Sequence, residues 1–81
     1  MNEQELLAGV MAELTSIAPE VDPAALARAR PLREQVDLDS MDWLNFLIAL
    51  HERFKVDIPE SDYARLRTLD DLAAYLAARI A

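Results

Sequence analysis

Apolar residues recur at three- and four-residue spacing in three segments of the chain. In the first segment they are Leu6, Leu7, Val10, Met11, Leu14 and Ile17. This spacing is typical of an amphipathic helix, and Pro19 is expected to end it. A second run predicts a helix from about Ser40 to Lys55. A third predicts a helix that begins at Thr68, because Asp71 follows three residues later and completes a capping-box pattern.

The connection between the first two helices spans residues 19–39 and is long for a small domain. Within it, Asp22 followed by Pro23 is typical of a helix start. We therefore expect the following AALARAR segment, residues 24–30, to form a short helix that the next proline stops. Residues 32–39 are expected to be irregular, with their apolar side chains on the core.

The composition favours helices throughout. The chain has a single glycine, abundant Ala and Leu, and no strand pattern or internal repeat. Residues 60–65 are expected to form one short helical turn. The sequence thus predicts an all-α fold, a small four-helix bundle with three main helices plus one or two short ones, in a single domain over residues 1–81.

Charge and residue usage exclude several functions. Fifteen acidic and eight basic residues give a net charge of −7, which disfavours nucleic acid and favours basic protein partners. The chain has no cysteine, and His51 is its one histidine, so neither a thiol nucleophile nor a histidine-based metal site is expected. No apolar run is long enough to cross a membrane, and no targeting segment is visible. We expect a free-standing, monomeric, cytoplasmic protein.

The second predicted helix carries two apolar arcs on its helical wheel. The wider arc, expected to face the core, contains Trp43, Phe46, Leu47, Leu50 and Phe54. The second arc contains Met41, Leu44 and Ile48. Two interpretations are open: either the helix is buried on two sides, or the second arc is partly exposed and forms a docking patch.

Ser40 stands where the polar connection meets this helix. A serine at that position is most often a cap or a first-turn residue without chemistry. It cannot be the nucleophile of an enzyme formed by this chain alone, because His51 lies three turns further along the same helix, too far to act as its base. The helix N-terminus does, however, favour an anion, so Ser40 suits an attached phosphate.

The run LREQVDLDSMDWLNFLIALHERF, residues 32–54, resembles the core signature of acyl carrier proteins. In that family an Asp-Ser-Leu triplet opens the second helix, and here the triplet is Asp39-Ser40-Met41. The segments VDIP and TLDDL further along also match. Three positions depart from the pattern: Asp37 replaces a usual glycine, Asn45 replaces a common acidic residue, and Trp43 is bulky. These departures suggest a specialised carrier.

The resemblance implies that a phosphopantetheinyl transferase attaches 4′-phosphopantetheine from coenzyme A to Ser40. The thiol of that arm then carries acyl groups as thioesters, and the chain itself has no catalytic activity. Asp39 is expected to cap the helix and to take part in transferase recognition. The partners implied are acyl-activating, acyltransferase or synthase enzymes of fatty acid, polyketide or related specialised lipid biosynthesis, with basic docking surfaces. Candidate partner-binding residues are Met41, Asp42, Leu44, Asn45, Ile48 and Glu52.

Two alternatives remain open from the sequence. The cargo could be an amino acid or a peptide, as in carriers of nonribosomal peptide synthesis or of D-alanine. The chain could instead be a helical adaptor without a prosthetic group, in which case Ser40→Ala would leave its activity intact. Loading assays with coenzyme A and activating enzymes distinguish these possibilities.

Overall fold

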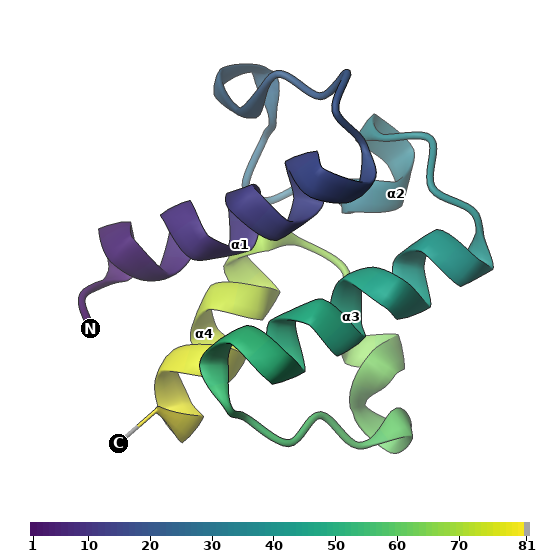
Figure 1. The fold of residues 1–81 in the computed structure, drawn as a ribbon. Coiled ribbons are helices and arrows are strands. Elements are labelled where there is room, and N and C mark those ends of the chain that lie inside the picture. The colour runs from purple at the N-terminus through teal and green to yellow at the C-terminus, as the bar shows by residue number, and fades with distance from the viewer. Residues whose placement is uncertain (81) are drawn as a thin grey trace.

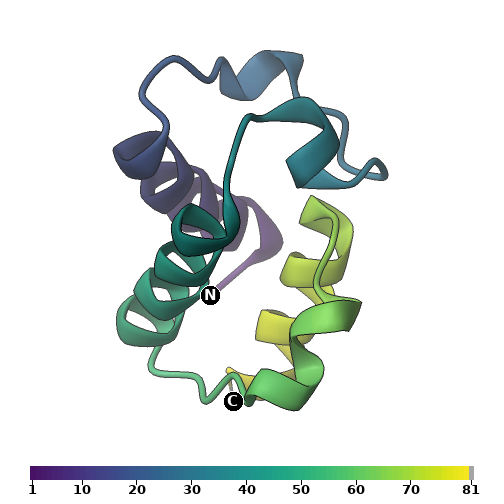
Figure 2. The ribbon, with the colours of Figure 1, turned by 90° about the vertical axis from the view of Figure 1, so that its right-hand side faces the viewer.

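The computed structural model describes residues 1–80 as a small bundle of helices (Figure 1). Its helical elements are α1 (Glu3–Ile17), η1 (Pro23–Ala25), α2 (Leu32–Gln35), α3 (Ser40–Phe54), η2 (Glu60–Arg65) and α4 (Leu69–Arg79), the η elements being 3₁₀ helices. Helix α1 packs against both α3 and α4. The connection that carries η1 and α2 lies over the end of the bundle where α3 and α4 begin (Figure 2). The predicted all-α bundle of three main helices with short additional ones is confirmed.

Side-chain caps fix where the main helices begin. Asn2 Oδ1 accepts a hydrogen bond from Glu5 N at 2.8 Å at the start of α1. At α4, Thr68 and Asp71 form the predicted capping box, in which each side chain accepts a hydrogen bond from the other residue's backbone N–H. These bonds satisfy amide groups that have no partner within the helix.

The core lies between the three long helices. Its fully buried side chains include Val10, Leu14, Leu32, Phe46, Leu47, Leu50, Leu66, Leu72 and Leu76. The wide apolar arc of α3 faces this core as predicted, although Trp43 and Phe54 at its two ends are only partly buried. No buried side chain in residues 1–80 is polar or charged, so apolar burial and backbone hydrogen bonds hold the bundle.

The predicted structure of the connection was wrong in two places. Helical turns are limited to Pro23–Ala25 instead of extending over residues 24–30, and the segment expected to be irregular contains α2. The reason lies in Gln35. Its Oε1 accepts from Ala27 N at 2.7 Å and its Nε2 donates to Ala27 O at 2.9 Å, so one side chain satisfies both backbone groups of Ala27 outside a helix. A continued α-helix would leave Ala27 O without a donor, because the residue four positions later is Pro31, which has no N–H.

Candidate functional site

Ser40 is the first residue of α3, and its side chain is not needed to cap the helix. Asp39 is the N-cap: its Oδ1 accepts a hydrogen bond from Asp42 N at 2.8 Å. The predicted capping role of Asp39 is therefore confirmed. Ser40 is exposed, and within residues 1–80 its hydroxyl has no hydrogen-bond partner. Capping therefore does not account for Ser40, which is an exposed first-turn residue with an unpartnered hydroxyl.

The first turn of α3 also offers free donors. Its backbone hydrogen bonds begin with Trp43 N to Asp39 O at 3.0 Å. The N–H groups of Ser40 and Met41 precede that bond and have no helical acceptor, while Asp42 N is taken by the cap. Together with the dipole of a 15-residue helix, these amides favour a negatively charged group beside Ser40.

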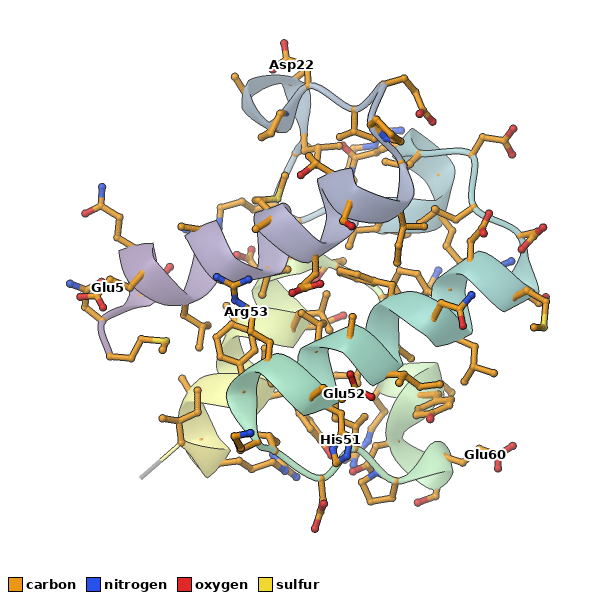
Figure 3. The ribbon with its side chains drawn as sticks, viewed as in Figure 1. Glu5, Asp22, His51, Glu52, Arg53 and Glu60 are labelled. Atoms are coloured by element: carbon orange, nitrogen blue, oxygen red, sulfur yellow. The ribbon has the colours of Figure 1, made fainter. Side chains whose placement is uncertain are left out.

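His51 has a structural role at the other end of α3. Its Nδ1 lies 2.7 Å from Val56 O and 3.9 Å from an exposed Asp57 carboxylate oxygen. Figure 3 shows the ring turned toward the loop that follows the helix. Three helical turns, about 16 Å, separate it from Ser40. The structure therefore keeps His51 away from Ser40, which agrees with the expectation from the sequence that His51 is too far to act as its base.

The second apolar arc of α3 is partly exposed. Met41 has 64% of its surface accessible and Ile48 has 42%, whereas Leu44 is half-buried. Of the polar candidates around them, Asn45 and Glu52 are exposed and Asp42 is half-buried. The interpretation that α3 is buried on two sides is therefore wrong, and the predicted patch is accessible on one face of the helix.

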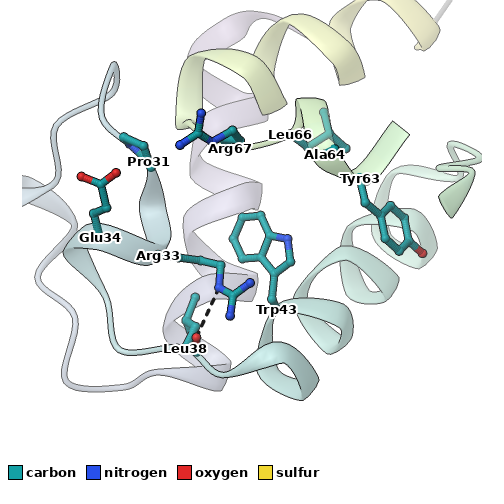
Figure 4. A pocket seen from close by; sticks show the side chains of 9 residues that line it. All are labelled: Pro31, Arg33, Glu34, Leu38, Trp43, Tyr63, Ala64, Leu66 and Arg67. Carbon is teal, nitrogen blue, oxygen red and sulfur yellow. Dashed lines mark hydrogen bonds between the residues drawn. The ribbon is translucent and has the colours of Figure 1, made fainter. Parts of the chain in front are cut away.

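An open pocket of ≈ 530 Å³ adjoins the start of α3 (Figure 4). Its lining residues are Pro31, Arg33, Glu34, Leu38, Trp43, Tyr63, Ala64, Leu66 and Arg67. Leu38 and Trp43 stand two residues before and three residues after Ser40, so the pocket lies next to the exposed serine. The Trp43 ring packs on Phe46, with ring centroids 5.4 Å apart. Sequence reasoning missed the two arginines, because their segments are distant in sequence and one was expected to be irregular.

The described part of the chain offers neither a membrane-spanning helix nor a metal site. No helix there combines the length and the apolar character needed to cross a membrane. Residues 1–80 also contain no group of three or more His, Asp or Glu side chains placed to hold a metal ion.

Comparison with known proteins assigns the family. A family model described as the phosphopantetheine attachment site matches residues 5–76. The chain belongs to the acyl carrier protein family. It is 30% identical to an acyl carrier protein of Thermosynechococcus vestitus, over all of this chain and 99% of that protein. It is 28% identical to the meromycolate extension acyl carrier protein of Mycolicibacterium aurum, over 93% of this chain and 76% of that protein.

A solved structure agrees with this assignment. The solution structure of a candidate acyl carrier protein from Anaplasma phagocytophilum superposes with a TM-score of 0.83 and 28% sequence identity. The match covers 96% of this chain and 91% of that one. The family therefore extends over almost the whole described bundle, including the start of α3.

The residues at the start of α3 fit the prosthetic group of the family. Ser40 offers an accessible hydroxyl without a partner, and the amides of the first turn favour the phosphate that would be linked to it. Asp37, which replaces a usual glycine of the acyl carrier proteins, is exposed. Its backbone does not have a positive φ; within residues 1–80 only Lys55 does, at 58°. The loop before Ser40 therefore does not require glycine at position 37.

Proposed function

We propose that Ser40 is the attachment residue for 4′-phosphopantetheine. The chain would then carry acyl intermediates, without catalytic activity of its own, between cytoplasmic enzymes of fatty acid, polyketide or related specialised lipid biosynthesis. One observation carries the proposal: in the region matched by the family, Asp39 caps α3 and leaves the exposed Ser40 hydroxyl unpartnered. When attached, phosphopantetheine supplies a thiol that holds acyl groups as thioesters.

Ser40 acts as the nucleophile while it is bound to a separate phosphopantetheinyl transferase. Its Oγ attacks the β-phosphorus of coenzyme A, and the bond from that phosphorus to the oxygen bridging the two phosphates breaks. Adenosine 3′,5′-bisphosphate leaves, and the serine proton passes to a base of the transferase. Asp39 holds the first turn in place during this step. The α3 N-terminus favours the negative charge of the phosphodiester that results.

The exposed face of α3 is the proposed docking surface. Met41, Leu44 and Ile48 supply an apolar centre, and the polar residues around it are Asp42, Asn45 and Glu52. Exposed ion pairs with basic partner surfaces contribute only about 0.2–1 kcal/mol each, so they steer encounter more than they hold the complex. Such weak binding suits a carrier that must leave each enzyme after each step.

Intact-mass spectrometry tests the attachment directly. After incubation with coenzyme A, Mg²⁺ and a broad-specificity transferase, the wild-type chain should gain the mass of one phosphopantetheinyl group. Ser40→Ala should gain nothing. Ser61→Ala is the matched control, because Ser61 is also exposed and also lies in the first turn of a helical element, η2, and it should be modified like the wild type. An unmodified wild type, or a modified Ser40→Ala variant, would contradict the proposal.

The names of the relatives support an acyl cargo over an aminoacyl one, since both curated relatives described above are acyl carrier proteins. The test is to offer the modified chain to fatty-acid-activating and amino-acid-activating enzymes in parallel. A mass increase for the fatty acyl thioester alone is expected. Loading by the amino acid alone would instead indicate an aminoacyl carrier.

A further inference from the structure

The pocket beside Ser40 has an apolar floor and a basic rim. Leu38 and Leu66 are buried at its base, and Trp43 and Tyr63 form half-buried walls. Figure 4 shows the Arg33 side chain extending toward the Trp43 ring, with Arg67 on the neighbouring segment. A ligand that fits this pocket would therefore have an apolar chain and a group that guanidinium binds.

The fold holds the two arginines on adjacent segments. Leu32 N donates to Arg67 O at 2.8 Å, which joins the start of α2 to the residue that precedes the N-cap of α4. Arg67 N in turn donates to Asp71 Oδ2 at 3.2 Å, and Arg33 Nε donates to Leu38 O at 3.4 Å. Residues 33 and 67 are far apart in sequence, and these bonds bring both to one pocket.

Both guanidinium groups are without an acidic partner. The ion pairs among residues 1–80 involve Arg28, Arg53, Arg65 and Arg79, together with a contact of His51, and include neither pocket arginine. Glu34 is the only acidic residue that lines the pocket, and Figure 4 shows it beside Pro31. Two positive charges and one negative charge leave the pocket with a surplus of +1 in a chain whose net charge is −7.

We infer that this pocket receives the far end of an acyl cargo that ends in a carboxylate. The inference rests on the proposed attachment at Ser40, because the arm is what brings the cargo to the pocket. The methylene part of such a cargo would pack on Leu38, Trp43 and Leu66. Its carboxylate would lie at the rim, where Arg33 and Arg67 present planar donor groups that match carboxylate geometry.

Trp43 provides a direct reporter, because it is the one tryptophan of the chain and it lines the pocket. The transferase can attach whole acyl-phosphopantetheine arms from acyl-coenzyme A. We would load ¹⁵N-labelled protein from coenzyme A, hexanoyl-coenzyme A or adipoyl-coenzyme A, the last two having equal chain length and differing in the terminal carboxylate. Mass spectrometry confirms each loading, and NMR measures the shift of the Trp43 indole N–H.

The adipoyl form should displace the Trp43 resonance more than the hexanoyl form, relative to the unacylated arm. Salt should reduce this excess, since it screens exposed charges. Arg33→Gln and Arg67→Gln should each reduce it by about 1.4- to 5-fold, the effect of an exposed ion pair. Arg30→Gln is the matched control: Arg30 is also exposed and outside any ion pair of residues 1–80, but it does not line this pocket, so the excess should persist.

Two results would overturn the inference. One is a hexanoyl displacement equal to or larger than the adipoyl displacement. The other is an equal effect of the arginine substitutions on the unacylated arm, which would show that Arg33 and Arg67 bind the phosphodiester and not the cargo. Failure of the proposed attachment is a separate outcome, because no arm would then appear in the mass spectrum.

Discussion

Substitution of Asp39 separates its capping role from its proposed role in transferase recognition. In Asp39→Ala the amide of Asp42 loses its 2.8 Å acceptor, and the positive end of α3 loses a nearby negative charge. Asp39 is exposed, so the substitution opens no cavity in the core. The expected loss of unfolding free energy therefore comes only from the missing cap and the missing charge.

The magnitude follows from those two terms. Loss of an N-cap costs about 1 kcal/mol of unfolding free energy, with a range of about 0.5–2. Loss of a charge at a helix N-terminus costs about 0.3–1 kcal/mol. A destabilisation of about 1 kcal/mol lowers the melting temperature of a domain this small by about 4–8 °C. Thermal unfolding followed by far-ultraviolet circular dichroism should show a decrease of at least that size.

Asp39→Asn is the control variant, because asparagine caps as well as aspartate but carries no charge. It should lose only the charge contribution, so its melting temperature should lie between those of Asp39→Ala and the wild type. If the carboxylate also contributes to transferase recognition, Asp39→Asn should be modified more slowly than the wild type despite its intact cap. An Asp39→Ala variant that melts at the wild-type temperature would refute the capping argument.

Three further substitutions test one close packing contact and two sets of side-chain hydrogen bonds. Gly9→Ala should lower the unfolding free energy, because a Cβ there would lie 2.7 Å from Phe54 Cζ and 2.8 Å from Arg53 Nε. Overpacking costs about 1–3 kcal/mol, and the better helix propensity of alanine offsets about 1 kcal/mol of it. In urea unfolding, Gly9→Ala should cost less in a Phe54→Leu background than in the wild type, and an equal cost in both would contradict the Phe54 contact. Gln35→Ala should lower the unfolding free energy by about 1–3 kcal/mol in urea unfolding, because both backbone groups of Ala27 lose their partner. A urea midpoint equal to that of the wild type would contradict this role of Gln35. The hydrogen bond from the Tyr75 hydroxyl, at 2.6 Å, is the largest cause that lowers the pKa of Asp62 below its ordinary 3.8. The stability this adds is present at neutral pH and is lost as the pH falls below that value, so Tyr75→Phe should differ from the wild type near neutral pH and converge with it in acid; a constant difference would refute it.

Local chemistry explains which parts of the fold the sequence predicts. Helix periodicity and caps depend on residues a few positions apart, so the start of α3 at Ser40 and the capping box at Thr68 could be read from the chain. The same holds for Asp39, whose bond spans three residues. The assignment of Ser40 as the candidate attachment residue comes from the resemblance of residues 32–54 to acyl carrier proteins, which also depends on neighbouring positions along the chain.

Contacts between distant segments decided the rest. The helix expected over residues 24–30 is absent because Gln35, several residues away, bonds to the backbone of that stretch. The exposure of the second apolar arc of α3 depends on where the other helices pack, which a helical wheel does not contain.

The sequence alone determined the helices of the bundle and the position of Ser40 at the N-terminus of α3, because both depend on residues that are close together along the chain. What only the tertiary structure decided is the pocket beside that serine. Arg33 and Arg67 both line it because a backbone hydrogen bond joins Leu32 to Arg67 across the fold, and no local pattern encodes that pairing.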